Sequence, residues 1–443
     1  MGTTRRGLAV STDDQEAIDA LDDFTDRLAG IRLGTDAVLS DAAAHPDVAA
    51  LALACAMLFL YGQTAESSRA AATHLAAAHA LEPTMNDRER ATLAALDRWA
   101  AADFLAGAEQ LEAHVARWPT DLLAVKALEF IYYVLGQQHM GPRFLAVMDA
   151  IADPNRGDAD FLAAHAFAAE LSGSVDRART LADAALAVEA HTPWAHHALA
   201  HVWITEGDPP AAIAQLESYL PVWETSGRVI HAHNAWHLAV AHLDRLALAS
   251  ADRVYRTHIW GFAPDSPGEQ IDAVSYLWRA EMAGAPVDHV RWDDIADHVE
   301  TRVDECVFPF LSAHQAFALA RAGRTDALAA LRATVAARAA ADDAEARRVW
   351  RPIGQAVVGA SAAYGSGDLV AAATALDPVI DAVGAVGGSD AQDDLFRQAH
   401  LTALIGSRRW DDARRRFVTM TSFKTLAPLD ESFLGRIERQ EAS

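Results

Sequence analysis

The stretch that decides the fold is residues 160–188, DFLAAHAFAAELSGSVDRARTLADAALAV. Alanine and leucine recur at steps of three and four residues on both sides of Gly173, which is the pattern of an amphipathic helix. A glycine between two such stretches supplies the backbone conformation at which helices commonly end. Residues 160–188 therefore predict two consecutive helices joined by a tight turn.

The same pattern continues along the chain of 443 residues. It predicts helices over residues 17–28, 70–81, 89–102 and 105–118, and it contains no strand signal. Further glycines close helical stretches, and where these are consecutive they lie about 34 to 44 residues apart, which is the period of a helix-turn-helix repeat: Gly136, Gly173, Gly207, Gly284, Gly323, Gly367 and Gly406. We therefore expect an all-α fold, a tetratricopeptide-like solenoid that runs as one continuous array over residues 1–443.

Composition and charge narrow the class of protein. A hydrophobic content of 51% excludes a disordered chain, and a net charge of −24 argues against nucleic acid or an anionic membrane as partner. The longest apolar run, Val48 to Tyr61, suits a buried helix better than a membrane span. The only cysteines, Cys55 and Cys306, sit among apolar residues and leave no room for a disulfide framework. We expect a cytoplasmic protein, and a homo-oligomer is compatible with these features.

Histidines are concentrated in one part of the sequence. Residues 191–242 hold eight of the nineteen histidines, including two pairs at helical spacing, His197/His201 and His233/His237. Residues four apart project from one face of a helix. Two neighbouring helices could therefore bring four imidazoles into one pocket, which we expect to be formed chiefly by residues 194–314.

A third helical stretch adds a carboxylate and a guanidinium. Asp272, Ser275 and Arg279 are spaced i, i+3, i+7, so one helix face presents all three. A histidine oriented by Asp272 could exchange a proton with a substrate, while Arg279 held a carboxylate or phosphate. Ser275 lies inside a predicted helix and so lacks the sharp exposed turn of a nucleophile elbow, which argues against a Ser-His-Asp triad.

The two histidine pairs with Asp272 are also a possible metal site. Four imidazoles and a carboxylate would suit zinc, iron or manganese. Ala198 and Asn234 occupy the positions at which the metalloprotease motif carries its glutamate, so that reading is weak. The sequence thus leaves open whether a divalent metal is a cofactor.

The order of motifs resembles the tetratricopeptide repeat protein 38 family nearly from end to end. Seven motifs carry the resemblance: GLAVST at 7–12, PTDLLAVK at 119–126, Trp194-x-x-His197-x-x-x-His201, HNAWHLA at 233–239, Asp272-x-x-Ser275-x-Leu277-x-Arg279, Phe310-x-x-x-His314 and GGSDAQDD at 387–394. The resemblance implies the fold and a pocket that includes His314 and Gln392, more firmly than it implies any activity. Residues 387–396 would help to form that pocket.

Three positions depart from the pattern of that family. Ile204 stands where the family usually has Glu, Ser312 where it has Asp, and Asp393 where it has Arg. The first two changes remove possible metal ligands or partners that orient a histidine. The third reverses a charge that could hold an anion.

These patterns support two functions. In the first, the pocket binds a small polar molecule and transforms it by acid/base or metal-assisted chemistry. In the second, the chain is a non-enzymatic scaffold that binds a peptide or protein partner, the histidines form a structural polar network, and the tryptophans are core. The candidate catalytic residues are His197, His201, His233, His237 and Asp272. The four histidines among them are also the candidate metal ligands. The candidate ligand-binding residues are Trp194, Asn234, Trp236, Ser275, Trp278, Arg279, His314 and Gln392.

The Gly387-Gly388-Ser389 stretch resembles a phosphate-binding loop in outline. It follows no predicted strand and lacks the lysine of a P-loop. A helix N-cap at Ser389 or Asp390 accounts for it.

Overall fold

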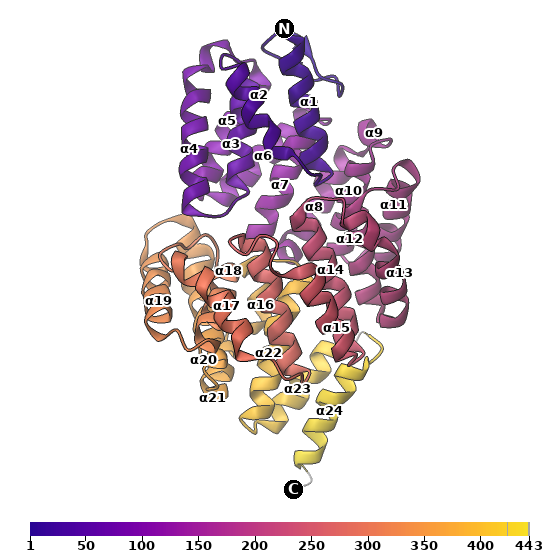
Figure 1. Cartoon of the computed structure of the whole chain (residues 1–443), viewed down its shortest axis with the longest axis vertical. Coiled ribbons are helices and arrows are strands. Elements are labelled where there is room, and N and C mark those ends of the chain that lie inside the picture. The colour runs from indigo at the N-terminus through magenta and orange to yellow at the C-terminus, as the bar shows by residue number, and fades with distance from the viewer. Residues whose placement is uncertain (423, 442–443) are drawn as a thin grey trace. The chain divides into compact units, whose positions relative to one another are not determined.

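The structure, a computed structural model, describes residues 1–422 and 424–441. Their regular secondary structure is almost entirely helical, which confirms the all-α prediction (Figure 1). The chain divides into two compact units, the first made of residues 1–198 and 225–227 and the second of residues 199–224 and 228–443. The single continuous array stays a prediction.

The first unit opens with a short antiparallel hairpin, in which Gly2 pairs with Val10 and Thr3 with Ala9. This corrects the expectation of no strands, because strands of two residues are too short to show an alternating pattern. The elements of the first unit are β1 (Gly2–Thr3), β2 (Ala9–Val10), α1 (Gln15–Ala29), η1 (Thr35–Ala37), α2 (Val38–Ala44), α3 (Ala49–Leu60), α4 (Ala65–Ala80), η2 (Glu82–Thr84), α5 (Asp87–Ala100), α6 (Phe104–Arg117), α7 (Leu122–Leu135), α8 (Gln137–Ala150), α9 (Ala152–Asn155), α10 (Ala159–Leu171) and α11 (Val175–Val188).

All regular elements among the described residues of the second unit are helices. Helix α12 (Pro193–Glu206) crosses from the first unit into the second after Ala198. The elements that follow are α13 (Pro209–Trp223), α14 (Arg228–Asp244), α15 (Leu248–Val254), η3 (Tyr255–Ile259), α16 (Pro267–Met282), α17 (His289–Val299), η4 (Glu300–Arg302), α18 (Pro309–Arg321), α19 (Thr325–Ala340), η5 (Ala346–Gly354), α20 (Gln355–Gly365), α21 (Leu369–Leu376), η6 (Ile380–Val386), α22 (Asp390–Gly406), α23 (Trp410–Thr421) and α24 (Pro428–Glu441).

The turns between paired helices follow one pattern. After α10, Gly173 has a φ of 77° and Ser174 N–H donates to the Ala169 carbonyl at 2.9 Å, which is a Schellman ending. Glycines at 284, 323 and 367 end α16, α18 and α20 in the same way. After α22 the prediction was wrong in detail, because Gly406 is the last helical residue and Arg408 takes the left-handed position, with a φ of 59°.

The long apolar run forms α3, and ten of its side chains are buried in the first unit. In the described part of the chain, no single helix is long and apolar enough to cross a membrane. One bent pair, α21 with η6, passes that test by length and composition alone.

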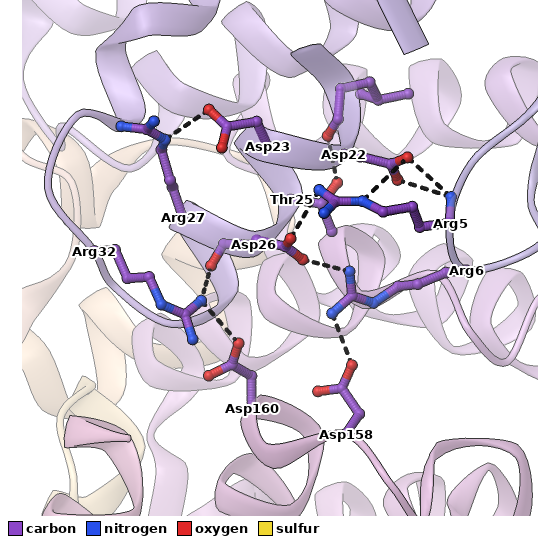
Figure 2. A network of polar contacts seen from close by, with 11 residues as sticks. Arg5, Arg6, Asp22, Asp23, Thr25, Asp26, Arg27, Arg32, Asp158 and Asp160 are labelled. Carbon is purple, nitrogen blue, oxygen red and sulfur yellow. Dashed lines mark hydrogen bonds and ion pairs between the residues drawn. The ribbon is translucent and has the colours of Figure 1, made fainter. Parts of the chain in front are cut away.

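A polar network fixes the N-terminal hairpin to the rest of the first unit (Figure 2). Arg6 donates to Asp26 on α1 at 2.6 Å and to Asp158, the N-cap of α10, at 2.7 Å. The backbone N–H of Arg5 donates to Asp22 at 2.9 Å. Arg6 therefore joins three segments that are far apart in the sequence.

Replacing Arg6 by alanine is expected to loosen the N-terminal segment. Only 19% of the Arg6 side chain is exposed, so losing its two ion pairs should lower the free energy of unfolding by about 1–2 kcal/mol. Hydrogen exchange of residues 1–12 measures the effect. The control is Arg27→Ala, which breaks an exposed pair with Asp23 on α1. Equal protection of residues 1–12 in both variants would contradict the prediction.

Candidate functional site: a buried histidine and carboxylate cluster

The centre of the cluster lies on α14 in the second unit. Trp236 and His237 are fully buried, and His233 lies one helical turn before His237. The helix is apolar around these residues, so the histidines point into packed protein instead of solvent. Burial removes water from each imidazole, so the protonation state of the ring depends on the protein groups that contact it.

His201, on the part of α12 that belongs to the second unit, meets His237. The two rings are 4.7 Å apart between centroids in an edge-to-face arrangement, and a nitrogen of each lies within 4.8 Å of a nitrogen of the other. On its Nδ1 side, His201 lies 2.9 Å from a carboxylate oxygen of Asp390. Asp390 is the first residue of α22, which Ser389 caps. This contact connects residues 189 positions apart in the sequence.

The protonation of this cluster follows from burial. Burial, together with the charges of His201, His233 and Arg279, holds the pKa of His237 well below its ordinary value. Burial alone would raise the pKa of Asp390, but the His201 ring beside it and the N–H of Ala391 lower it below the ordinary value. The cluster thus offers a neutral imidazole at His237 and an ionised carboxylate next to His201.

His233 has its own carboxylate partner. Its Nδ1 lies 3.0 and 3.2 Å from the two oxygens of Asp272 on α16, and its ring stacks on Trp236. His233 is the most exposed of the three histidines, with 15% of its side chain accessible, whereas Asp272 is buried. An imidazole oriented by a carboxylate is an arrangement used for proton transfer.

Arg279 on α16 contacts the first turns of α22. Its guanidinium donates to the Ala391 carbonyl at 2.7 Å, lies 3.5 Å from Asp394, and is 5.7 Å from the Trp236 ring. Burial lowers the pKa of Arg279, while Asp394 and Asp244 raise it. Ser275 accepts from the same guanidinium at 3.4 Å. Arg279 therefore uses much of its hydrogen-bonding capacity in contacts with α22 and with its own helix.

Four further candidates lie in the second unit. His314 donates from Nδ1 to the Phe310 carbonyl, its Nε2 has no hydrogen-bond partner among the described residues, and burial lowers its pKa to about 4. Gln392 accepts from Ser389 N–H and completes the helix cap, so the predicted cap is confirmed at Ser389. Trp278 stacks on Phe317 with centroids 3.8 Å apart, as a core residue does, and Asn234 is fully buried on α14.

Two of the predicted site residues belong to the first unit. The ring of His197 stacks on Trp194 with centroids 4.2 Å apart. The Trp194 indole donates to Glu129 at 2.8 Å, and the Lys126 ammonium lies over its face. Within the first unit, His197 is therefore in an aromatic and ionic environment built on α7 and α12.

The residues that depart from the family pattern have different surroundings. Ile204 is half-buried, and Ser312 lies beside Cys306, 3.9 Å from its sulfur. Burial raises the pKa of both Cys55 and Cys306 to about 11, which agrees with packing roles for these thiols. Asp393 is fully buried, and burial raises its pKa well above the ordinary value.

Sequence reasoning missed Asp390 as a site residue. Asp390 lies in the stretch 387–396 that the resemblance places at the pocket, but as a single residue it is predicted only as a possible helix cap. Nothing in the local pattern indicates contact with a histidine on α12. An available signal was the clustering of three aspartates, 390, 393 and 394, in the first turns of one helix.

No family model matches the chain. Membership in the tetratricopeptide repeat protein 38 family therefore stays a prediction. The structure itself establishes a helical protein with buried clusters of histidines and carboxylates that could bind a metal ion.

Proposed function

We propose that the second unit binds a divalent transition-metal ion through His201 and His237 and acts on a small polar molecule there. The observation that carries the proposal is the contact of two buried imidazoles, one of which has a carboxylate at 2.9 Å from its Nδ1. Histidines that ligate metals commonly donate their second ring N–H to a carboxylate, which fixes the tautomer and the ring orientation. Asp390, 2.9 Å from Nδ1 of His201, would supply that group and leave Nε2 as the ligand atom.

The protonation of the cluster supports metal binding. An imidazole must be neutral to coordinate a metal, and the depressed pKa of His237 keeps it neutral at physiological pH. Nitrogen ligands with nearby carboxylates suit zinc, iron or manganese. Two protein ligands also leave positions open for water or a substrate.

The burial of these groups supports a small molecule as ligand. His201, His237, Asp272 and Arg279 are each at most 3% exposed, so an extended peptide on the surface would not reach them. His233, oriented by Asp272, is the residue we assign to proton transfer. Arg279 would contribute its positive charge toward an anionic group of the ligand, although part of its donor capacity is used by α22.

The experiment is metal analysis of the full chain after loading with zinc, manganese or iron and removal of excess metal. We expect stoichiometric metal in the wild type and its loss in His237→Ala. Asp390→Asn keeps the shape of the side chain but removes its charge, and it should weaken metal affinity by about 10- to 100-fold. Cobalt substitution, followed by visible absorption, reports the ligand geometry.

The matched control is His289→Ala, which removes a histidine that is exposed on α17 and paired with Asp293. It should bind as much metal as the wild type. If His237→Ala bound as much metal as the wild type, His237 would not be a ligand and the proposed site would be wrong. If the loaded wild type held no stoichiometric metal, the proposal that the protein binds a metal ion would be wrong. Circular dichroism of each variant separates lost ligands from lost fold.

The finer architecture and family are also proposals. The recurring Schellman endings of α10, α16, α18 and α20 support helix pairs of the tetratricopeptide type. The ordered motifs support membership in the tetratricopeptide repeat protein 38 family.

A further inference from the structure

A hollow of about 320 Å³ opens at the C-terminal end of α22 in the second unit. It is lined by Ile405, Gly406, Arg408, Trp410, Arg436 and Arg439. Three of these six residues are arginines and none is acidic. In a chain with 61 acidic and 37 basic residues, such a lining is unexpected on composition alone.

The arginines of the hollow have no carboxylate partner. Within the described part of the chain, neither Arg408 nor Arg436 nor Arg439 has a carboxylate oxygen within 4.0 Å. Arginines on the adjoining helix α23 and its N-cap behave differently, since Arg409 pairs with Asp377 at 2.7 Å and Arg416 with Asp381 at 3.1 Å. Asp377 and Asp381 therefore neutralise Arg409 and Arg416, whereas the arginines that line the hollow keep their positive charge.

The positive charges of the hollow act on one another. The pKa of Arg436 is lowered, first by burial and further by the charge of Arg439. Two like charges held together without a counter-ion cost free energy, which a bound anion would recover.

Capping of helix ends explains only part of this arrangement. Arg436 donates to the carbonyl of Met282, at the end of α16, at a long 3.4 Å. Arginines near helix C-termini commonly make such contacts. No hydrogen bond from the side chain of Arg408 or Arg439 to a carbonyl is found among the described residues, so capping does not account for these two.

We propose that this hollow is a binding site for a phosphate group. A guanidinium presents paired donors that match the oxygens of a phosphate, and two or three of them around one hollow make a strong oxyanion site. Trp410 adds an indole to the lining, against which an apolar part of a phosphorylated small molecule could pack. The site does not depend on the histidine cluster.

The test is a calorimetric titration of the full chain with inorganic phosphate at low ionic strength. A chelator is present, so that phosphate held by a metal at the histidine cluster does not contribute. We expect saturable binding of one phosphate per chain, and affinity lower by at least about tenfold in Arg439→Gln and in Arg436→Gln. The control is Arg415→Gln, because Arg415 is 71% exposed and paired with Asp412, and it should bind as the wild type does.

Two results would overturn the proposal. One is phosphate binding that does not saturate in the wild type, and the other is equal affinity in Arg439→Gln and the wild type. Arg439 is exposed and makes no hydrogen bond within the described residues, so its replacement should not disturb the fold. Its variant therefore decides the outcome even if Arg436→Gln is destabilised by losing the Met282 contact.

Discussion

Replacement of Arg279 by methionine is expected to destabilise the second unit by about 1.5–3 kcal/mol, because it removes a charged hydrogen-bond donor from the contact between α16 and α22. The guanidinium is 2% exposed and connects α16 to the first turns of α22. Methionine fills a similar volume, so the loss reports mainly on charge and hydrogen bonds and little on a cavity.

The reason lies in what the substitution leaves behind. Without Arg279, the Ala391 carbonyl loses a 2.7 Å hydrogen bond and Asp394 loses a neighbouring positive charge. The loss of a hydrogen bond from a charged donor costs about 1.5–3 kcal/mol. Gln398 still donates to Asp394 at 2.7 Å, which limits the cost at that carboxylate.

Urea unfolding of the full chain, followed by circular dichroism, measures the effect, and hydrogen exchange assigns it to α16 and α22. Arg253→Met is the control, because Arg253 is exposed on α15 and its replacement should change stability by less than about 0.5 kcal/mol. A loss below about 1 kcal/mol in Arg279→Met would show that Arg279 is not structural and would favour a role in ligand binding alone.

The helices of this protein were predictable from local sequence, and the exceptions have physical causes. Alanine and leucine periodicity predicted helices that the structure contains as α1, α4, α5, α6, α10 and α11, with ends shifted by a few residues. Glycine marked most of the turns. It did not mark the turns at Ala102, Leu246 and Arg408, where a residue with a side chain adopts a φ of 55° to 59°. Such a turn costs about 1 kcal/mol, which neighbouring packing offsets, so the sequence gives no sign of it.

The candidate site was predictable only in part, because periodicity identifies a helix face but not its neighbours. Spacing placed His233 and His237 on one face of α14 and Asp272 on one face of α16, and these faces meet. The family resemblance implied that residues 387–396 help to form the pocket, but no local pattern indicated that Asp390 would contact His201. That contact depends on how helices pack, and packing is set by many small contacts spread along the chain.

Replacing Asp393 by asparagine is expected to stabilise the protein at pH 7. Asp393 is fully buried, and neither of its oxygens has a hydrogen-bond partner within the described residues. Burial raises its pKa well above the ordinary value, the charge of Arg397 only partly opposes this, and Asp390 and Asp394 raise it further. Asparagine has nearly the same shape and carries no charge at any pH, so it avoids the cost of burying a carboxylate.

The pH dependence of stability gives the sign of the effect. Above the pKa of an unfolded aspartate, about 3.9, the unfolded chain loses a proton that folded Asp393 keeps. The contribution of Asp393 to stability is therefore complete below that pH and is lost as the pH rises through its folded pKa, at about 1.4 kcal/mol per pH unit. Asp393→Asn should remove this decline.

The buried histidines have the opposite effect on the pH dependence of stability. The pKa values of His237 and His314 are lowered, the second to about 4, so their contribution is present above about pH 6.5 and is lost as the pH falls. Wild-type stability should thus decline on both sides of an intermediate pH. Asp393→Asn should reduce the decline at higher pH without abolishing it, because burial also raises the pKa of Asp244, to about 7. Thermal melts from pH 4 to 8 measure both, with Asp411→Asn, an exposed aspartate of α23, as control. If Asp393 is instead an ionised partner of Arg397, the asparagine variant will be less stable than the wild type at pH 7, because it removes one charge of a buried pair.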